Sequence, residues 1–175
     1  MSAVPARAAP EAAPDLPRRL REETLDLHRA TEAEPAFARL LDPGLTREAY
    51  LRHLAAMLGF YEPAERALAA HRGVAELALE RRLVKATRLR ADLASLGLDA
   101  AAAAALPRWP GRDLSRLETA WGFAYVLEGA TLGGRLIARQ VASTLGLAPG
   151  PGLSFLEPYG GESGALWRGF REATR

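Results

Sequence analysis

The sequence lacks cysteine entirely and contains a single lysine, Lys85, among 175 residues. The absence of cysteine excludes disulfides, thiolate metal sites and cysteine nucleophiles. It fits a reducing compartment, and we expect a cytoplasmic location. The net charge of +2 comes from arginines that alternate with acidic residues, so no basic block predicts nucleic-acid binding. Arginine suits bidentate carboxylate ligands, although a GC-rich genome explains most of this bias more simply.

Long apolar runs are also missing. No segment is apolar for the ~20 residues that a transmembrane helix requires, so we expect no membrane association. Residues 1–15 are rich in alanine and proline and have no apolar core, which excludes a secretory signal and predicts a disordered tail. We therefore expect one folded domain over residues 16–175.

Aromatic residues make up only 7% of the chain, and alanine and leucine carry most of the apolar content. This composition favours helices over sheets. Apolar periodicity predicts an all-α bundle of about six helices with no strand and no internal repeat. Thr46 and the pair Ser115 and Glu118 are typical N-terminal caps, and Gly97 and Gly146 are typical helix ends. The predicted longer helices cover residues 16–34, 36–41, 47–71, 74–97, 116–145 and 164–175.

The common catalytic motifs are absent. None of the three histidines follows a glutamate by three residues, and no two lie four apart, which excludes bundle-type di-iron sites and zincin-type sites. There is also no Gly-x-x-x-x-Gly-Lys phosphate loop and no Gly-x-Ser-x-Gly nucleophile motif.

Two features remain, and together they suit a flat ligand held between two helices. His28 lies on the edge of a helical face formed by Leu20, Thr24, Leu27 and Thr31, from which it could supply an axial nitrogen to haem iron. The stretch LEGATLGGRLIARQV (127–141) has three glycines in an otherwise good helix sequence, and each weakens a helix interior by roughly 1 kcal/mol. Such glycines let the backbone approach a ligand closely.

The segments LREETLDLHRATE (20–32) and WGFAYVLEGATLGGRLIARQV (121–141) resemble the proximal and distal helix motifs of the haem oxygenases. The likeness is greatest to the bacterial biliverdin-producing type associated with bacteriophytochromes. It extends over about residues 16–172 and includes EAYLRHLAAMLGFYEPAE between the two motifs. It implies a haem oxygenase-like bundle with haem between a proximal helix and a kinked distal helix.

The resemblance also implies roles for individual residues. His28 corresponds to the proximal haem ligand and so to the metal ligand, and Arg21 to a basic residue at a haem propionate. Arg168 and Arg171 are both candidates for a second propionate contact. The distal-helix residues implied to lie over the haem are Gly129, Gly133 and Gly134, with Thr131 among them.

One position departs from the pattern of many haem oxygenases. Where they have an aspartate that orders water for proton delivery, this chain has Ala130. The phytochrome-associated type commonly has a small residue there. Glu128 and Thr131 are the nearby polar candidates for a proton route, and ordered water is the alternative.

The activity implied is O2- and reductant-dependent cleavage of haem to biliverdin, CO and Fe2+, with haem as both substrate and cofactor. The resemblance implies an external ferredoxin- or flavin-type reductase as electron donor and a bacteriophytochrome as a candidate partner. Two other hypotheses stay open. One is a non-catalytic haem-binding or haem-delivery protein of the same fold, which the missing aspartate favours, and the other is a purely structural helical bundle.

Overall fold

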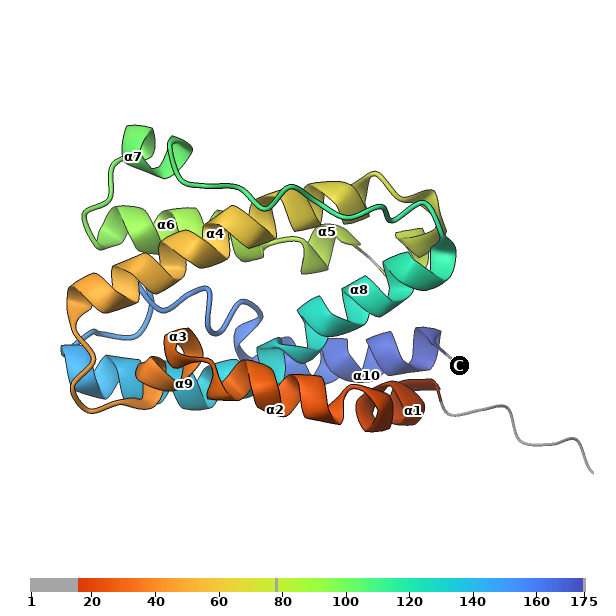
Figure 1. Ribbon diagram of the computed structural model, residues 1–175, viewed down its shortest axis with the longest axis horizontal. Helices are drawn as coiled ribbons and strands as arrows, with labels where there is room; N and C mark the ends of the chain where they lie inside the picture. Colours follow the sequence, from red (N-terminus) through yellow and green to blue (C-terminus); the bar gives the residue numbers. More distant parts are fainter. Residues whose placement is uncertain (1–15, 78, 175) are drawn as a thin grey trace, which may run out of the picture.

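The computed structural model describes residues 16–77 and 79–174, with side chains placed for 16–74 and 80–174. The predicted tail, residues 1–15, lies outside this range. Every regular element in the described part of the chain is a helix, which confirms the all-α prediction (Figure 1). Among the described residues, no helix has both the length and the hydropathy needed to cross a bilayer.

The predicted helix 16–34 is divided at Thr24. Helix α1 covers Leu16–Glu23 and α2 covers Leu25–Ala33, while Thr24 has φ −102° and ψ 3°. Its Oγ1 donates to the Leu20 carbonyl at 2.7 Å. A threonine hydroxyl that bonds back to the preceding turn bends a helix, which accounts for the break. The short helices α3 (Pro35–Ala38) and η1 (Arg39–Leu41) follow.

The core is built around α4 (Arg47–Ala69), which packs along α6 (Lys85–Ser95) in the upper half of Figure 1. As predicted, Thr46 caps α4, since its Oγ1 accepts the Ala49 N–H at 3.2 Å. The helix then continues through Pro63. The two helices contribute four leucines to the core, Leu54, Leu58, Leu89 and Leu93, each at most 1% exposed.

The prediction of one helix over residues 74–97 is wrong. The chain forms η2 (Arg72–Leu77), α5 (Leu79–Arg82) and α6 instead. A new helix, α6, begins at Lys85 because a residue distant in sequence caps it there. The Glu65 carboxylate accepts the backbone N–H groups of Lys85 at 2.8 Å and Ala86 at 3.2 Å. Gly97, at φ +90°, follows the end of α6 as predicted. Helix α7 (Ala100–Ala104) and an extended connection lead back across the bundle.

The glycine-rich helix is also divided, at Ala130, into α8 (Leu117–Gly129) and α9 (Thr131–Leu145). The predicted Ser115–Glu118 capping box is wrong. Arg116 occupies the N-cap position without a side-chain bond, and the Ser115 N–H donates to Asp113 Oδ1 at 2.8 Å. The end of α9 at Gly146, with φ +64°, is as predicted. A loop, η3 (Gly160–Glu162) and α10 (Ser163–Ala173) complete the chain.

Candidate functional site

Helix α2 has no buried residue. Every residue from 25 to 36 is exposed, although the segment is fixed at both ends by the buried residues Pro17 and Leu40. At the second end, η1 packs against α9. In Figure 1 the segment runs along the lower edge of the molecule, with α1 close to the end of α10. A helix that is held at its ends and covered nowhere along its length leaves one of its faces available to a ligand.

His28 lies near the middle of this helix, and its side chain is 66% exposed. Its Nδ1 atom is 3.5 Å from a carboxylate oxygen of Glu32, one turn later. Histidines that bind metals commonly hold one ring nitrogen against a carboxylate and use the other as the ligand. In the part of the chain that the structure describes, no group of three or more His, Asp or Glu side chains could hold a metal ion unaided.

The other two histidines are engaged elsewhere. His53 is buried against Phe37, with the two rings edge to face at 5.3 Å, and burial lowers the pKa of His53 to about 4. His71 Nδ1 accepts the backbone N–H of Gly73 at 3.1 Å. These contacts give both residues structural roles in the fold.

The break between α8 and α9 has a local cause. Thr131 Oγ1 donates to the carbonyl of Glu128 at 2.7 Å, three residues earlier, and so uses an acceptor of the helix itself. Thr131 is 8% exposed, and its hydroxyl hydrogen is directed to the backbone. The hydroxyl therefore stabilises the bend.

The three glycines have different surroundings. A Cβ at Gly133 would have no neighbour within 4 Å, so the backbone is open there. A Cβ at Gly129 would touch the Trp167 ring at 3.8 Å, an ordinary contact. At Gly134 the Cβ would lie 1.9 Å from the Leu156 carbonyl oxygen. Helix–loop packing is therefore sufficient to explain Gly134, whereas only Gly133 faces unoccupied space.

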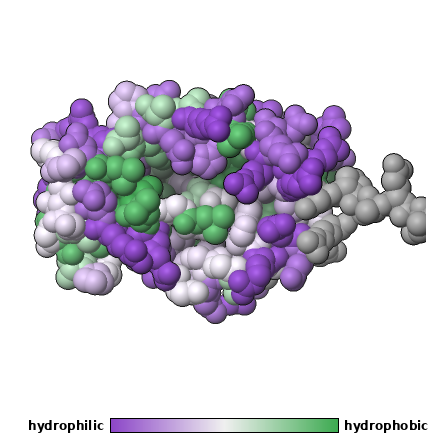
Figure 2. All heavy atoms as spheres, turned by 90° about the horizontal axis from the view of Figure 1, so that it is seen from below, coloured by the Kyte–Doolittle hydropathy of each residue, from purple (hydrophilic) through white to green (hydrophobic). Residues whose placement is uncertain are grey.

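The helices that carry His28 and the three glycines also carry exposed leucines and a valine. Single exposed apolar residues are ordinary, but a group of them beside an exposed histidine is typical of a ligand or interaction site. Figure 2 shows the side on which α1 and α2 lie, where hydrophobic residues gather in its left and central parts between hydrophilic ones. The large exposed apolar residues of α2, α8 and α9 are Leu25, Leu27, Leu117, Val126, Leu132 and Leu136, at 40–70% exposure.

Two of the predicted propionate residues lie near one hydroxyl. Burial raises the pKa of Tyr125 in α8, and the positive charges of Arg21 and Arg171 partly oppose that rise. Arg21 from α1 and Arg171 from α10 therefore both lie within electrostatic range of Tyr125, although they are far apart in sequence. Arg168 is exposed, and its Nη1 lies beside Gly164, one turn earlier in α10. The structure thus distinguishes the two C-terminal arginines.

A comparison with protein-family models gives a match to the model described as heme oxygenase over residues 14–174, nearly the whole chain. The chain belongs to the haem oxygenase family. No curated protein and no solved structure matches it. The fold of the haem oxygenase family agrees with the all-helical architecture, and haem is the substrate of that family.

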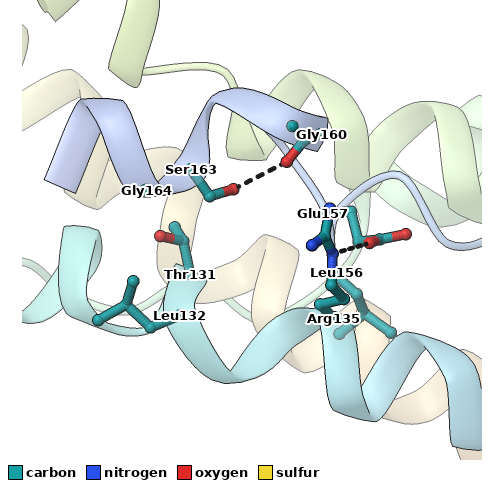
Figure 3. Close-up of a pocket in the computed structure, with 9 residues that line it drawn as sticks. Thr131, Leu132, Arg135, Leu156, Glu157, Gly160, Ser163 and Gly164 are labelled. Atoms are coloured by element: carbon teal, nitrogen blue, oxygen red, sulfur yellow. Dashed lines mark hydrogen bonds and ion pairs between the residues drawn. The ribbon is translucent and has the colours of Figure 1, made fainter.

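This member of the haem oxygenase family has a small pocket beside α9. It measures about 200 Å³ and lies between α9 and the segment 156–164, with Thr131, Leu132 and Arg135 on one side (Figure 3). Arg135 Nε is 3.4 Å from Glu157 at its edge. Sites for drug-sized ligands occupy about 300–1,000 Å³, so this space is too small for a porphyrin.

Sequence reasoning missed the buried Asp92 carboxylate, and it named Glu128 as a candidate for the proton route without its buried ion-pair partners. The Asp92 carboxylate accepts four hydrogen bonds from the loop after α9, and Glu128 is enclosed by Arg82, Lys85 and Tyr159. One signal was present in the sequence: Lys85 is the only lysine in a chain that otherwise uses arginine.

Proposed function

We propose that this chain is a catalytically active haem oxygenase that uses O2 and a reductant to convert haem to biliverdin, CO and Fe2+. The observation that carries the proposal is the uncovered helix α2, on which His28, Leu25 and Leu27 are exposed and which leads through α3 into η1, packed against α9. The family match supports haem as the substrate.

In this proposal His28 is the proximal iron ligand, and Glu32 orients its ring through Nδ1. Leu27 in α2 and Leu136 in α9, which are 70% and 66% exposed, would cover the faces of the porphyrin. Haem supplies both the iron that activates O2 and the ring that is cleaved. Burial of these apolar side chains against the ligand would add to the affinity.

Arg21 and Arg171 would bind the haem propionates. Their charges both act on the pKa of Tyr125, and arginine pairs well with carboxylates. Arg168 is the secondary candidate. Such contacts would fix the haem in one rotational position.

On the distal side, the open backbone at Gly133 would leave room for O2 above the iron, with Gly129 beside it. Thr131 and Gly134 support the backbone at this point. Ala130 is exposed and carries no acid, so the protons would come from water ordered along the exposed distal backbone. Electrons would come from an external ferredoxin- or flavin-type reductase in the cytoplasm, with a bacteriophytochrome as a candidate acceptor of the product.

A hemin titration tests the binding step. We expect the wild type to give a Soret band that His28→Ala loses. The matched control His71→Ala removes a half-buried histidine outside α2 and should behave like the wild type. Reductant in air should then convert the complex to biliverdin. Failure of the wild type to bind hemin would contradict the whole proposal.

A second variant addresses the distal side. Gly133→Val should preserve the fold, because a Cβ there has no neighbour within 4 Å, and should block turnover by filling the space above the ligand. An unchanged yield of biliverdin would contradict the assignment of Gly133.

The second candidate function is a haem carrier of the same fold, favoured by Ala130 in the aspartate position. It predicts hemin binding that depends on His28, but a reduced complex that persists in air without biliverdin. The turnover assay therefore separates the two functions.

A further inference from the structure

A buried group of four side chains lies next to the break in the distal helix. We call it the Glu128 clamp, and its members are Arg82, Lys85, Glu128 and Tyr159. Arg82, Lys85 and Glu128 are 6%, 2% and 4% exposed. They come from α5, the first residue of α6, the end of α8 and the segment before η3. The group therefore joins parts of the chain that are distant in sequence.

Both carboxylate oxygens of Glu128 have a cationic partner. Lys85 Nζ donates to Oε1 at 2.9 Å, and Arg82 Nη1 pairs with Oε2. The Tyr159 hydroxyl lies 2.6 Å from Oε1 and 2.6 Å from Lys85 Nζ. Arg82 Nη2 also donates to the Leu166 carbonyl at 3.0 Å, which extends the group to α10. Charge-assisted bonds of this kind fix geometry strongly.

Lysine at position 85 has a geometric reason. Its ammonium meets three acceptors: Glu128 Oε1, the Tyr159 oxygen and, at 3.2 Å, the Arg82 carbonyl. A compact group with three rotatable donors suits this arrangement, whereas the planar guanidinium used everywhere else in the chain does not. Buried ion pairs often contribute no net stability compared with apolar residues of similar volume, so such a group calls for a role in specifying geometry.

The clamp acts on the residue whose carbonyl forms part of the break. Glu128 is held through its side chain, and its own carbonyl accepts the Thr131 hydroxyl at 2.7 Å across Gly129 and Ala130. Fixing Glu128 therefore fixes the end of α8 and the direction in which α9 begins.

We propose that the Glu128 clamp positions the distal backbone for catalysis, by setting where Gly129 and Gly133 lie relative to α2. This inference rests on the proposed function. Glu128 is a positioning residue in this scheme, since it acts through the backbone and not by touching haem.

Hydrogen exchange of the ligand-free protein tests the clamp without haem. In Glu128→Gln we expect amides of residues 126–134 to exchange about tenfold faster than in the wild type, with α4 unchanged. Tyr159→Phe removes one hydroxyl and gives a milder variant if the first fails to fold. The matched control is Glu62→Gln, because Glu62 also pairs with two arginines, Arg90 and Arg108, outside the clamp. Equal exchange at 126–134 in wild type, Glu128→Gln and Tyr159→Phe would overturn the clamp.

Turnover tests its role in the reaction, well below the unfolding temperature of each variant. Glu128→Gln and Tyr159→Phe should bind hemin within about threefold of wild type, yet turn over about tenfold more slowly and give a broader mixture of biliverdin isomers. Glu62→Gln should match the wild type. A wild-type rate and isomer composition in a variant with faster exchange would overturn the positioning role. Absence of biliverdin from the wild type would instead overturn the proposed function, and the exchange experiment would still report on the clamp.

Discussion

The carbonyl oxygen of Leu156 lies 1.9 Å from the position that a Cβ would take at Gly134, so the loop after α9 and the helix itself touch backbone to backbone. At the adjacent Gly133 the same position has no neighbour within 4 Å. Two consecutive glycines therefore have different roles: Gly134 allows close packing against the loop, and Gly133 leaves the backbone open.

This contrast predicts opposite effects of alanine. Gly134→Ala should lower the free energy of unfolding by about 2–3 kcal/mol, because backbone atoms must move apart. Gly133→Ala should leave it unchanged or raise it by roughly 0.5–1 kcal/mol, since alanine is the better helix former. Urea unfolding of the ligand-free variants measures both. Equal stability of the two variants would contradict the packing role of Gly134.

The loop that carries Leu156 depends on Asp92. Its carboxylate accepts the N–H groups of Gly152, Ser154 and Phe155 and the Ser154 hydroxyl, at 2.7–3.1 Å. Asp92→Asn replaces one acceptor oxygen by a donor that faces other donors, so we expect a loss of about 2–4 kcal/mol in unfolding free energy.

A matched control for this variant is Asp99→Asn. Asp99 also accepts a backbone N–H, from Ala102 at 2.7 Å, but at an exposed helix start where asparagine caps equally well. Asp99→Asn should lower the free energy of unfolding, measured by heat or urea, by less than about 0.5 kcal/mol. Similar losses in both variants would show that Asp92 does not hold the loop in the way described.

His53 makes stability depend on pH. Burial lowers its pKa from 6.5 to about 4. Between these pH values the imidazole is protonated in the unfolded chain but stays neutral in the folded protein. The contribution of the neutral His53 to the free energy of unfolding is therefore fully present above pH 6.5. It is lost as the pH falls towards 4, by about 3 kcal/mol at most.

Urea unfolding between pH 4 and 7.5 measures this effect as the difference between wild type and His53→Gln. That difference should change across the window, while His71→Gln should follow the wild type. Parallel curves for wild type and His53→Gln would contradict the burial argument.

The two arginines of α10 should differ in haem affinity. Arg171 shares the surroundings of Tyr125 with Arg21, so Arg171→Gln should weaken hemin binding about tenfold, or ~1.4 kcal/mol. Arg168→Gln should change it by less than about twofold. Titrations followed by absorbance give both constants, and the reverse order would assign the propionate contact to Arg168.

Local signals in the sequence predicted much of the fold. Thr46, Gly97 and Gly146 mark helix ends through their own side chain or backbone conformation, and all three act as predicted. The break before Lys85 was missed because its cap comes from Glu65, twenty residues earlier. The Ser115 cap failed because the Asp113 carboxylate, two residues earlier, accepts both the N–H and the hydroxyl of Ser115.

The candidate site divides in the same way. The exposed helix around His28 and the open backbone at Gly133 belong to segments whose patterns pointed to a ligand. In contrast, no pattern separates Gly133 from Gly134, because the difference depends on a loop more than twenty residues away. The pairing of Glu128 with Lys85 is likewise tertiary and gave no periodic signal.

The burial of Lys85 has a practical consequence for work with this protein. The folded chain carries a single ε-amino group, and its residue is 2% exposed. Acylating reagents directed at lysine should therefore leave the folded state unmodified at this position and label it only in molecules that have opened. Mass spectrometry of that one adduct would count opening events of the domain interior directly, without an engineered probe.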